Sequence, residues 1–439
     1  MKKVYILLLG AILVTASCST DLDEVPPNIA SSDSLTDFEG VLNAAYYYQL
    51  GAVTPMAVMG DFRADNALML ESPYTEYDLY GPGLTAMEDQ FFGPFYTALY
   101  RSILSTNNVI ENSEDPVQIG EAKFLRALSY FKLVQAFGDV TVILTSPDIG
   151  DIPTFDLKRK PVNEVYNNVI IPDLQDAMSL LDNTSVNGRA SRLAAQALLG
   201  KVYVHMGNFA NAATQFQTFL NSAGTAGISL ETEYADVFDL ANIENSEIIY
   251  ATQISSSVID EYGFSEFWEW YLGQDSKSPA PLDPDLISAY DASPGDLRRA
   301  VNIDETALRS PKYPQSGGPD HDWIELRLAD VILLYAEALN ENGSPATTVL
   351  PLLDDIRERA GLDVLDPTII NTQTLVRKAI QDERRLELAF EGHRWFDLVR
   401  TGTVDSEMGQ TINPNYYVFP IPISEVLVSN GVITQNPGY

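Results

Sequence analysis

Two stretches of the chain share one apolar spacing, and this repeat restricts the fold more than any other feature. In both stretches apolar residues recur at steps of three and four, so that they lie on one face of a helix. Each stretch ends near a glycine, Gly207 or Gly343, and a second amphipathic segment begins shortly afterwards. The chain is therefore expected to form repeated helical hairpins. The apolar positions are Ala195, Leu198, Leu199, Val202, Tyr203 and Met206, and then Leu328, Val331, Ile332, Tyr335, Ala336 and Leu339.

The order of small, large and aromatic residues around a glycine-containing turn is similar to that of tetratricopeptide units. Each such unit leaves an apolar face that only a neighbouring unit can cover, so several units should stack into a short solenoid. We therefore predict a mainly α-helical, tetratricopeptide-like scaffold. Its hairpins are expected at about residues 91–137, 191–221, 324–359 and 372–400, with a further amphipathic helix at 162–182.

Long irregular stretches interrupt the helical pattern. They are rich in Gly, Pro, Ser, Asn and Asp, and they are far longer than ordinary connections between elements. We predict that they are non-helical insertions, which in a compact protein usually carry function. These stretches are residues 50–90, 138–161, 222–323 and 403–439.

The first residues have the layout of a secretory signal. Two lysines are followed by an apolar run over residues 4–14 and by three small residues before Cys18. This run is shorter than the ~20 residues that a membrane-spanning helix needs. We predict that residues 1–17 are a lipoprotein signal peptide and that Cys18 is the lipidation site. An ordinary cleaved signal with a leftover thiol is the alternative.

Cys18 is the only cysteine of the chain, which excludes an internal disulfide and a cysteine nucleophile elsewhere. Residues 18–30 are polar and acidic, and they are predicted to form a flexible tether. Residues 18–439 are predicted to form a single domain beyond the signal peptide.

The chain is strongly acidic. Its formal net charge is −34, and removal of Lys2 and Lys3 with the signal peptide would move it to −36. Nucleic acid binding requires a basic stripe, and the longest basic cluster is only Lys158–Lys160. Sulfated or uronate polysaccharides would meet the same repulsion. The charge therefore favours neutral partners and disfavours nucleic acid.

Signatures of enzymes are scarce. The chain contains no Gly-x-Ser-x-Gly elbow, no phosphate-binding glycine loop and no His-Glu-x-x-His motif. With 61 acidic residues, no particular pair of carboxylates can be singled out for glycoside hydrolysis. We predict that the protein is not an enzyme.

No metal or other cofactor is predicted. Asp283 and Asp285, like Asp320 and Asp322, offer oxygen ligands, but their spacing does not resemble a calcium-binding loop. A structural calcium ion remains an alternative. The three histidines, His205, His321 and His393, lie far apart and are predicted to be structural.

Six aromatic residues gather within residues 262–271, inside an irregular stretch. Trp268 and Trp270 alternate, so that in an extended strand both indoles would lie on one side, next to Tyr271. Exposed rings can stack on the C–H face of a sugar. We predict that these three residues form a glycan-binding platform; packing in the core is the alternative reading.

A second cluster lies within the irregular stretch 50–90. Tyr74, Tyr77 and Tyr80 stand among turn residues, which favours surface exposure. Asp65 and Asn66 are predicted to contact sugar hydroxyls nearby, although they could equally cap the turn. We predict that this cluster assists the platform.

The C-terminal third carries a specific pattern. It reads Gln-Asp-Glu-Arg-Arg-Leu-Glu-Leu-Ala-Phe-Glu-Gly-His-Arg-Trp-Phe-Asp-Leu-Val-Arg-Thr-Gly over 381–402, Pro-Ile-Pro over 420–422 and Asn-Pro-Gly-Tyr over 436–439. Together and in this order, these segments closely resemble the SusD/RagB family of Bacteroidota nutrient-binding lipoproteins. The acidic tether likewise resembles the export tag that directs such lipoproteins to the outer face.

The resemblance implies a tetratricopeptide scaffold that contacts a SusC-like TonB-dependent transporter, and glycan held by the insertions at about 50–90 and 222–323. The C-terminal motif itself is expected to maintain the fold. Arg384, Arg385, Glu387 and Glu391 can pair at helical spacing, and Trp395 can pack behind them.

These observations predict a lipoprotein on the extracellular face of the outer membrane, anchored at Cys18, that captures a glycan and delivers it to the transporter. The charge favours a neutral glucan, with a laminarin-type β-glucan as the first guess. Two alternatives stay open. One is a surface glycoside hydrolase, and the other is a protein-only scaffold that docks partners on its helical repeats.

Overall fold

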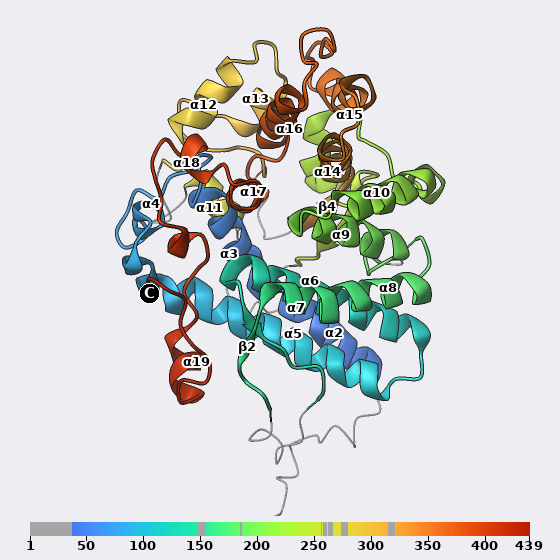
Figure 1. The fold of residues 1–439 in the computed structure, drawn as a ribbon, viewed down its shortest axis with the longest axis vertical. Helices are drawn as coiled ribbons and strands as arrows, with labels where there is room; N and C mark the ends of the chain where they lie inside the picture. The colour runs from blue at the N-terminus through green and yellow to red at the C-terminus, as the bar shows by residue number, and fades with distance from the viewer. Residues whose placement is uncertain are drawn as a thin grey trace, which may run out of the picture. The chain divides into compact units, whose positions relative to one another are not determined.

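The computed structural model describes residues 37–146, 155–184, 187–255, 257, 261, 267–273, 280–314 and 321–439. Residues Asp37–Tyr439 form one compact unit (Figure 1). The predicted signal peptide, Cys18 and the tether at 18–30 lie outside the described residues, as does Asp320.

Most of the described chain is helical, which confirms the predicted fold class. The helices are α2 (Phe38–Tyr48), α3 (Val53–Ala57), α4 (Glu76–Leu79), α5 (Gly93–Asn112), α6 (Pro116–Phe137), α7 (Val162–Val165), α8 (Ile171–Leu180), α9 (Arg192–His205), α10 (Phe209–Ala223), α11 (Trp268–Leu272), α12 (Pro284–Asp291), α13 (Arg298–Asn302), α14 (Leu328–Glu341), α15 (Ala346–Arg359), α16 (Gln373–Glu387), α17 (Arg394–Thr401), α18 (Val404–Glu407) and α19 (Ile423–Val428). Short 3-10 or π-helical turns connect several of them, among them the π-helical turn Val58–Phe62.

The hairpin of α9 and α10 illustrates why the repeated spacing folds as it does. Ser191 caps α9, because its hydroxyl accepts a hydrogen bond from the backbone N–H of Ala194 at 3.0 Å. Gly207 then turns the chain with a φ of +70°, and Asn208 caps α10. The helices α14 and α15 form the corresponding hairpin, and Gly343 takes a φ of +82° between them.

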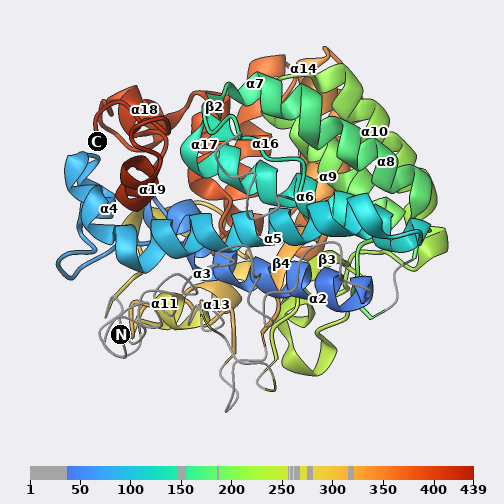
Figure 2. The same ribbon diagram turned by 90° about the horizontal axis from the view of Figure 1, so that it is seen from below.

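The hairpins stack in chain order. Helix α5 packs on α6, α6 on α8, α8 on α9, α9 on α10, and α10 on α14, which also contacts α15 and α16 (Figure 1). Helix α2 lies beside α5 (Figure 2). Neighbouring units thus cover one another's apolar faces, as a solenoid requires.

The stretches predicted to be non-helical insertions contain more regular structure than expected. Helices α3, α4, α11, α12, α13, α18 and α19 lie within them, so the prediction of non-helical insertions is wrong at these positions. The predicted helix at 162–182 is divided into α7, a π-helical turn over Tyr166–Ile170 and α8. Short elements of this kind are stabilised by tertiary packing more than by their own sequence pattern.

Two small antiparallel sheets complete the described fold. Strand β1 (Val140–Thr141) pairs with β2 (Arg159–Lys160). Strand β3 (Ile248–Thr252) pairs with β4 (Trp323–Arg327), with Ile248 opposite Arg327 and Thr252 opposite Trp323. In the part of the chain that the structure describes, no helix combines the length and the hydrophobicity needed to cross a membrane.

Candidate functional site

The predicted aromatic platform lies in the protein core. Trp268, Trp270 and Tyr271 belong to helix α11 and not to an extended strand, and their side chains are only 6%, 3% and 1% exposed. The ring of Trp270 packs edge-on against Tyr74 at 5.2 Å and against Phe91 at 5.5 Å between ring centroids. Rings enclosed in this way offer no face on which a sugar can stack. The rest of the aromatic segment, residues 262–266, lies outside the described residues.

Tyr271 has a polar partner inside the core. Its hydroxyl donates to Oδ2 of Asp61 at 2.8 Å, and its ring stacks on Phe62 at 5.6 Å. Asp61 also accepts hydrogen bonds from the backbone N–H of Gly392 at 2.8 Å and from the Asn66 side chain at 3.0 Å. Burial nevertheless raises the pKa of Asp61 to about 6, against the effect of these hydrogen bonds.

The tyrosine cluster at 74–80 is packed in the same region, and the predicted exposure is wrong here too. Tyr77 is fully buried, and Tyr74 and Tyr80 are half-buried. Tyr80 stacks on Trp395 at 5.8 Å, and the guanidinium of the buried Arg63 lies 4.5 Å from the centre of its ring. These contacts connect the loop to the C-terminal motif.

Asp65 and Asn66 are buried and engaged with arginines. Both carboxylate oxygens of Asp65 accept hydrogen bonds from Arg394 at 2.7 Å, and Arg385 lies 3.1 Å from Oδ2. Burial alone would raise the pKa of Asp65, but the hydrogen bonds and charge of Arg394 outweigh burial and lower it. The Oδ1 atom of Asn66 accepts from Nε of Arg385 at 3.3 Å. Asp65 and Asn66 are therefore not exposed for the predicted contacts with sugar hydroxyls.

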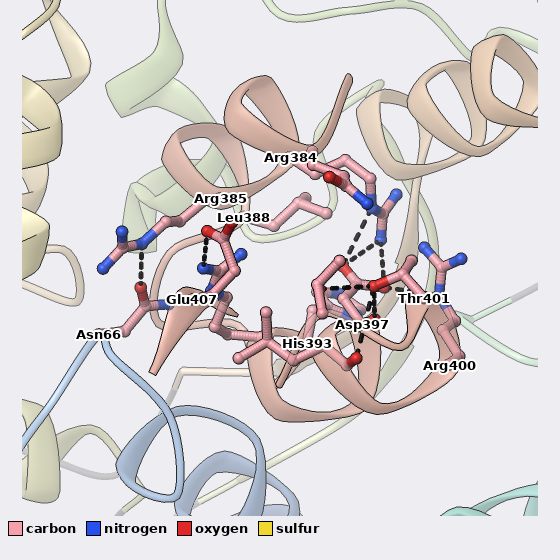
Figure 3. Close-up of a pocket in the computed structure, with 13 residues that line it drawn as sticks. Asn66, Arg384, Arg385, Leu388, His393, Asp397, Arg400, Thr401 and Glu407 are labelled. Carbon is pink, nitrogen blue, oxygen red and sulfur yellow. Dashed lines mark hydrogen bonds and ion pairs between the residues drawn. The ribbon is translucent and has the colours of Figure 1, made fainter. Parts of the chain in front are cut away.

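Figure 3 shows the small cavity beside the C-terminal motif. Its volume is about 20 Å³, which is room for about one water molecule and not for a sugar ring. Arg384 and Arg400 both point at Asp397 across it, at 3.0 and 2.8 Å. Arg400 also pairs with Glu337 on α14. The cavity is therefore part of a structural network.

Arg384, Arg385, Glu387 and Glu391 do not pair with one another at helical spacing, which corrects the predicted geometry. Arg384 pairs with Asp330 on α14 at 2.7 Å and Arg385 with Asp65. The carboxylate of Glu387 accepts hydrogen bonds from three arginines, which come from separate segments of the chain: Arg298 at 2.9 Å, Arg327 at 2.7 Å and Arg359.

Glu391 likewise pairs across the fold, with Lys312 and Arg327, each at 2.6 Å. Trp395 is fully buried, and its indole N–H donates to the backbone oxygen of Tyr417 at 3.1 Å. The contacts of these residues join distant segments of the chain and give the motif a role in stabilising the fold.

A much larger open hollow lies elsewhere, along β3. It has a volume of about 440 Å³, and an adjoining hollow of about 270 Å³ shares residues 187–188, 250–251 and 253 of its lining. We call the two hollows together the β3 groove. The larger hollow is lined mainly by Asn43, Tyr46 and Tyr47 of α2, by residues 187–189 and by residues 250–253.

Helix α2 brings the two groove tyrosines into place. Asp37 caps the helix, because its side chain accepts a hydrogen bond from the backbone N–H of Gly40 at 2.9 Å. Leu42 and Ala45 are fully buried on the face against α5 and α6, while Tyr46 and Tyr47 lie half-buried at the last turn. The hydroxyl of Tyr47 accepts a hydrogen bond from the backbone N–H of Glu261 at 3.1 Å.

A tight turn forms the opposite wall. Asn187 and Gly188 both have positive φ, +55° and +68°. A Cβ atom on Gly188 would lie 2.2 Å from Nε2 of Gln253, so the missing side chain lets the turn approach the end of β3 closely. The groove thus has three amide side chains, from Asn43 on α2, from Asn187 in the turn and from Gln253 just after β3.

Strand β3 provides a fixed floor. The hydroxyl of Thr252 donates to Oε1 of Glu325 on β4 at 2.7 Å, and Lys132 lies 2.5 Å from the same oxygen. The backbone N–H of Ile254 donates to Oδ1 of Asp322 at 2.8 Å. These contacts fix the position of β3 and of the residue pair that follows it.

Whereas Glu244 and Asp322 line the adjoining hollow, the larger hollow is lined by tyrosine rings and amide groups. Among its described lining residues, none is an aspartate or a glutamate, and Arg189 is the one cation. The described residues also contain no group of three or more His, Cys, Asp or Glu side chains placed to hold a metal ion. Tyrosine rings and amide groups together are the side chains that recognise the C–H faces and hydroxyls of a sugar.

The groove was not predicted from the sequence, because helix α2 was not predicted. The signal was present, since Asp37 precedes apolar residues at positions 38, 41, 42 and 45, a capping residue followed by helical spacing. The contribution of β3 and of residues 187–189 has no local signal, because these segments meet α2 only through the tertiary fold.

Comparison with known families and curated proteins finds relatives along the whole chain. Residues 297–416 match the family described as the SusD family, and residues 21–204 match the family described as starch-binding, associating with the outer membrane. A SusD-like protein of Formosa agariphila is 26% identical over 525 aligned residues, which cover 100% of both chains. The starch-binding protein SusD of Bacteroides thetaiotaomicron is 30% identical over 132 residues, which cover 28% of this chain and 22% of that protein.

Solved structures share the fold. A SusD superfamily protein from Parabacteroides distasonis has a TM-score of 0.77 at 22% identity and covers 94% of this chain and 100% of its own. A laminarin-binding SusD-like protein has a TM-score of 0.71 at 24% identity and covers 92% of this chain and 99% of its own. At these identities the likeness concerns the fold.

Proposed function

Because the chain belongs to the SusD family, we propose that it captures a glycan at the cell surface and delivers it, uncleaved, to a SusC-like TonB-dependent transporter. The mature protein is then a lipoprotein on the extracellular face of the outer membrane, anchored through Cys18. The family matched by residues 21–204 is described as starch-binding and as associating with the outer membrane. This description supports the proposed binding of a glycan and the proposed location at the outer membrane.

The observation that carries the proposal is the β3 groove. Its larger hollow, of about 440 Å³, lies within the range of roughly 300–1,000 Å³ that is usual for ligand pockets, and the adjoining hollow adds about 270 Å³. Its larger hollow is lined by two half-buried tyrosines and by three amide side chains, those of Asn43, Asn187 and Gln253. We place the glycan there, and we assign Trp268, Trp270, Tyr271 and the cluster at 74–80 to packing of the core.

The proposed ligand is a neutral glucan, with a laminarin-type β-glucan as the first candidate. A formal net charge of −34 opposes polyanionic glycans at long range. One similar structure is that of a laminarin-binding SusD-like protein, which supports the choice of glucan to be tested first.

Affinity electrophoresis of purified residues 18–439 tests the function. Gels containing laminarin, mixed-linkage β-glucan, starch or alginate are compared, with bovine serum albumin as a non-binding control. We expect retardation by at least one neutral glucan and none by alginate. Free migration in every neutral glucan would contradict the proposal and leave the protein-only scaffold.

Two further readouts address the rest of the proposal. Release of reducing ends from the bound glucan would indicate the glycoside hydrolase instead of a binding protein. Delivery requires a complex, so the protein should co-purify with a TonB-dependent barrel from native membranes in mild detergent. Recovery of the protein only by itself would contradict that partner.

A further inference from the structure

Arg189 carries a positive charge in the wall of the β3 groove, and two carboxylates outside the lining compensate it. Its Nη2 atom donates to Oε1 of Glu39 at 2.6 Å and to Oδ1 of Asn43, and its Nη1 atom lies 3.3 Å from Oε2 of Glu121. Neither carboxylate is among the residues that line the larger hollow. The guanidinium therefore faces the groove with its charge already paired.

Contacts with Tyr46 and Glu121 fix the position of the Arg189 guanidinium. The guanidinium lies 5.3 Å from the centre of the Tyr46 ring. The Tyr46 hydroxyl donates to Oε2 of the buried Glu121 at 2.7 Å and accepts from the backbone N–H of Ala190 at 3.0 Å. Burial, and then the electrostatic interactions with Tyr250 and Glu121, raise the pKa of Tyr46 well above its ordinary value, so this hydroxyl stays protonated.

On the outer side, Glu39 is fixed by a second contact. Its Oε2 atom accepts a hydrogen bond from the side chain of Gln118 on α6 at 3.3 Å. Burial alone would lower the pKa of Arg189, but the charge of Glu121 and the hydrogen bond to Glu39 outweigh burial and raise it. One positive and two negative charges thus sit together at this wall.

We infer that Glu39 and Glu121 set the ligand class of the larger hollow of the β3 groove by neutralising Arg189, so that this hollow accepts uncharged saccharides and rejects uronates. This inference rests on the proposed function of the groove. A guanidinium has five N–H donors, of which hydrogen bonds to Glu39 and Asn43 take up two, while Glu121 forms an ion pair with the Nη1 side. The remaining donors can bind sugar hydroxyls. A carboxylate on the sugar would instead meet a local excess of negative charge.

Glu39→Gln tests the inference with little risk to folding, because the Glu39 side chain is about half exposed. Its amide oxygen can still accept from Arg189, but the charge is lost. We expect the affinity for an oligoglucuronate to rise by roughly threefold or more at low salt, and this gain to disappear at high salt. The affinity for a laminarin oligosaccharide of the same length should change by less than about twofold.

Asp382→Asn is the matched control. It removes the same charge from an equally exposed carboxylate on α16, whose partner is Lys378 and not Arg189. Calorimetric titration of both oligosaccharides with the wild type and both variants separates local from general electrostatics. An equal gain in uronate affinity in both variants overturns the inference, because it would then reflect net charge.

The failure of the inference and the failure of the proposed function remain distinguishable. If the wild type binds a neutral glucan but Glu39→Gln leaves the preference between the two oligosaccharides unchanged, only the role of the carboxylates is wrong. If the wild type prefers the oligoglucuronate, the inference is overturned as well. If the wild type binds neither oligosaccharide nor any neutral glucan, the proposed function fails and the inference fails with it.

Discussion

At the scale of single residues, Trp270 is a packing residue despite its place in an aromatic-rich insertion. Its ring contacts Tyr74 and Phe91 and is 3% exposed. We expect Trp270→Ala to lower the free energy of unfolding by about 3–5 kcal/mol, because it removes a large buried ring. Urea denaturation of the wild type and the variant measures this loss.

The opposite outcome is equally clear. If Trp270→Ala unfolds at the same urea concentration as the wild type and binds neutral glucan more weakly, the ring is a ligand contact and our placement of the glycan is wrong.

The raised pKa of Asp78 leads us to expect that the stability of the protein depends on pH. Burial raises the pKa of Asp78 to about 7, the nearby Asp283 adds to the shift, and the hydrogen bond from the backbone N–H of Met69 opposes it. The raised pKa means that the fold favours the protonated form. In the unfolded chain Asp78 ionises near its ordinary pKa of about 4, whereas in the folded protein it keeps its proton until about pH 7. The contribution of Asp78 to stability is therefore fully present below pH ~4 and is lost as the pH rises through about 7.

Asp78→Asn cannot ionise but can still accept from Met69. The melting temperature of the variant, relative to the wild type, should therefore be higher at pH 8 than at pH 5. Thermal melts at the two pH values test this, and a difference that does not change with pH would refute the assignment.

The sequence could locate the aromatic residues but not their exposure. Trp268 and Trp270 are residue types that often bind sugars, which suggested a platform. The partners that bury Trp270, however, are Tyr74 and Phe91, which lie far away in the sequence. Exposure is decided by such distant contacts. By contrast, the prediction that the C-terminal motif maintains the fold agrees with the buried ion pairs of Glu387 and Glu391.

At the scale of helices, the close approach of α9 and α10 depends on Gly200. A Cβ atom at this position would lie 2.4 Å from Cε1 of Phe216. Overpacking costs about 1–3 kcal/mol, while replacing a helical glycine by alanine gains about 1 kcal/mol in propensity. We expect Gly200→Ala to lower the melting temperature, measured by circular dichroism.

Gly224→Ala is the matched control, because a Cβ atom on Gly224 would meet nothing within 4 Å and the residue has a φ of −61°. Its melting temperature should stay within about a degree or rise slightly. If both variants melt like the wild type, the hairpin does not depend on this close packing.

The long helices could be predicted because their signal is local. Apolar spacing, a capping Ser or Asn and a terminal glycine all lie within one segment, as in α9 and α10. The short helices in the insertions have no such signal. Helix α11 is only five residues long and is held by packing on other segments.

At the scale of the whole molecule, the account requires attachment to the outer membrane through Cys18. Cys18→Ala should release the protein into the soluble fraction without changing its affinity for glucan, because the proposed groove is built by residues of the compact unit Asp37–Tyr439, to which Cys18 does not belong. Fractionation with detergent extraction, followed by affinity electrophoresis of the soluble form, measures both. A variant that still sediments with membranes would contradict lipidation at Cys18.

The central claim is that the folded unit binds a neutral glucan in the β3 groove, and isothermal titration calorimetry of Tyr47→Ala tests it most directly. Aromatic stacking on a sugar should contribute ~1–3 kcal/mol by analogy with stacking on nucleobases. Tyr47 lines the groove, whereas its half-buried neighbour Tyr48 does not. We predict that Tyr47→Ala binds the retained glucan about tenfold more weakly and that Tyr48→Ala binds it like the wild type. Wild-type affinity in a folded Tyr47→Ala variant would contradict the account.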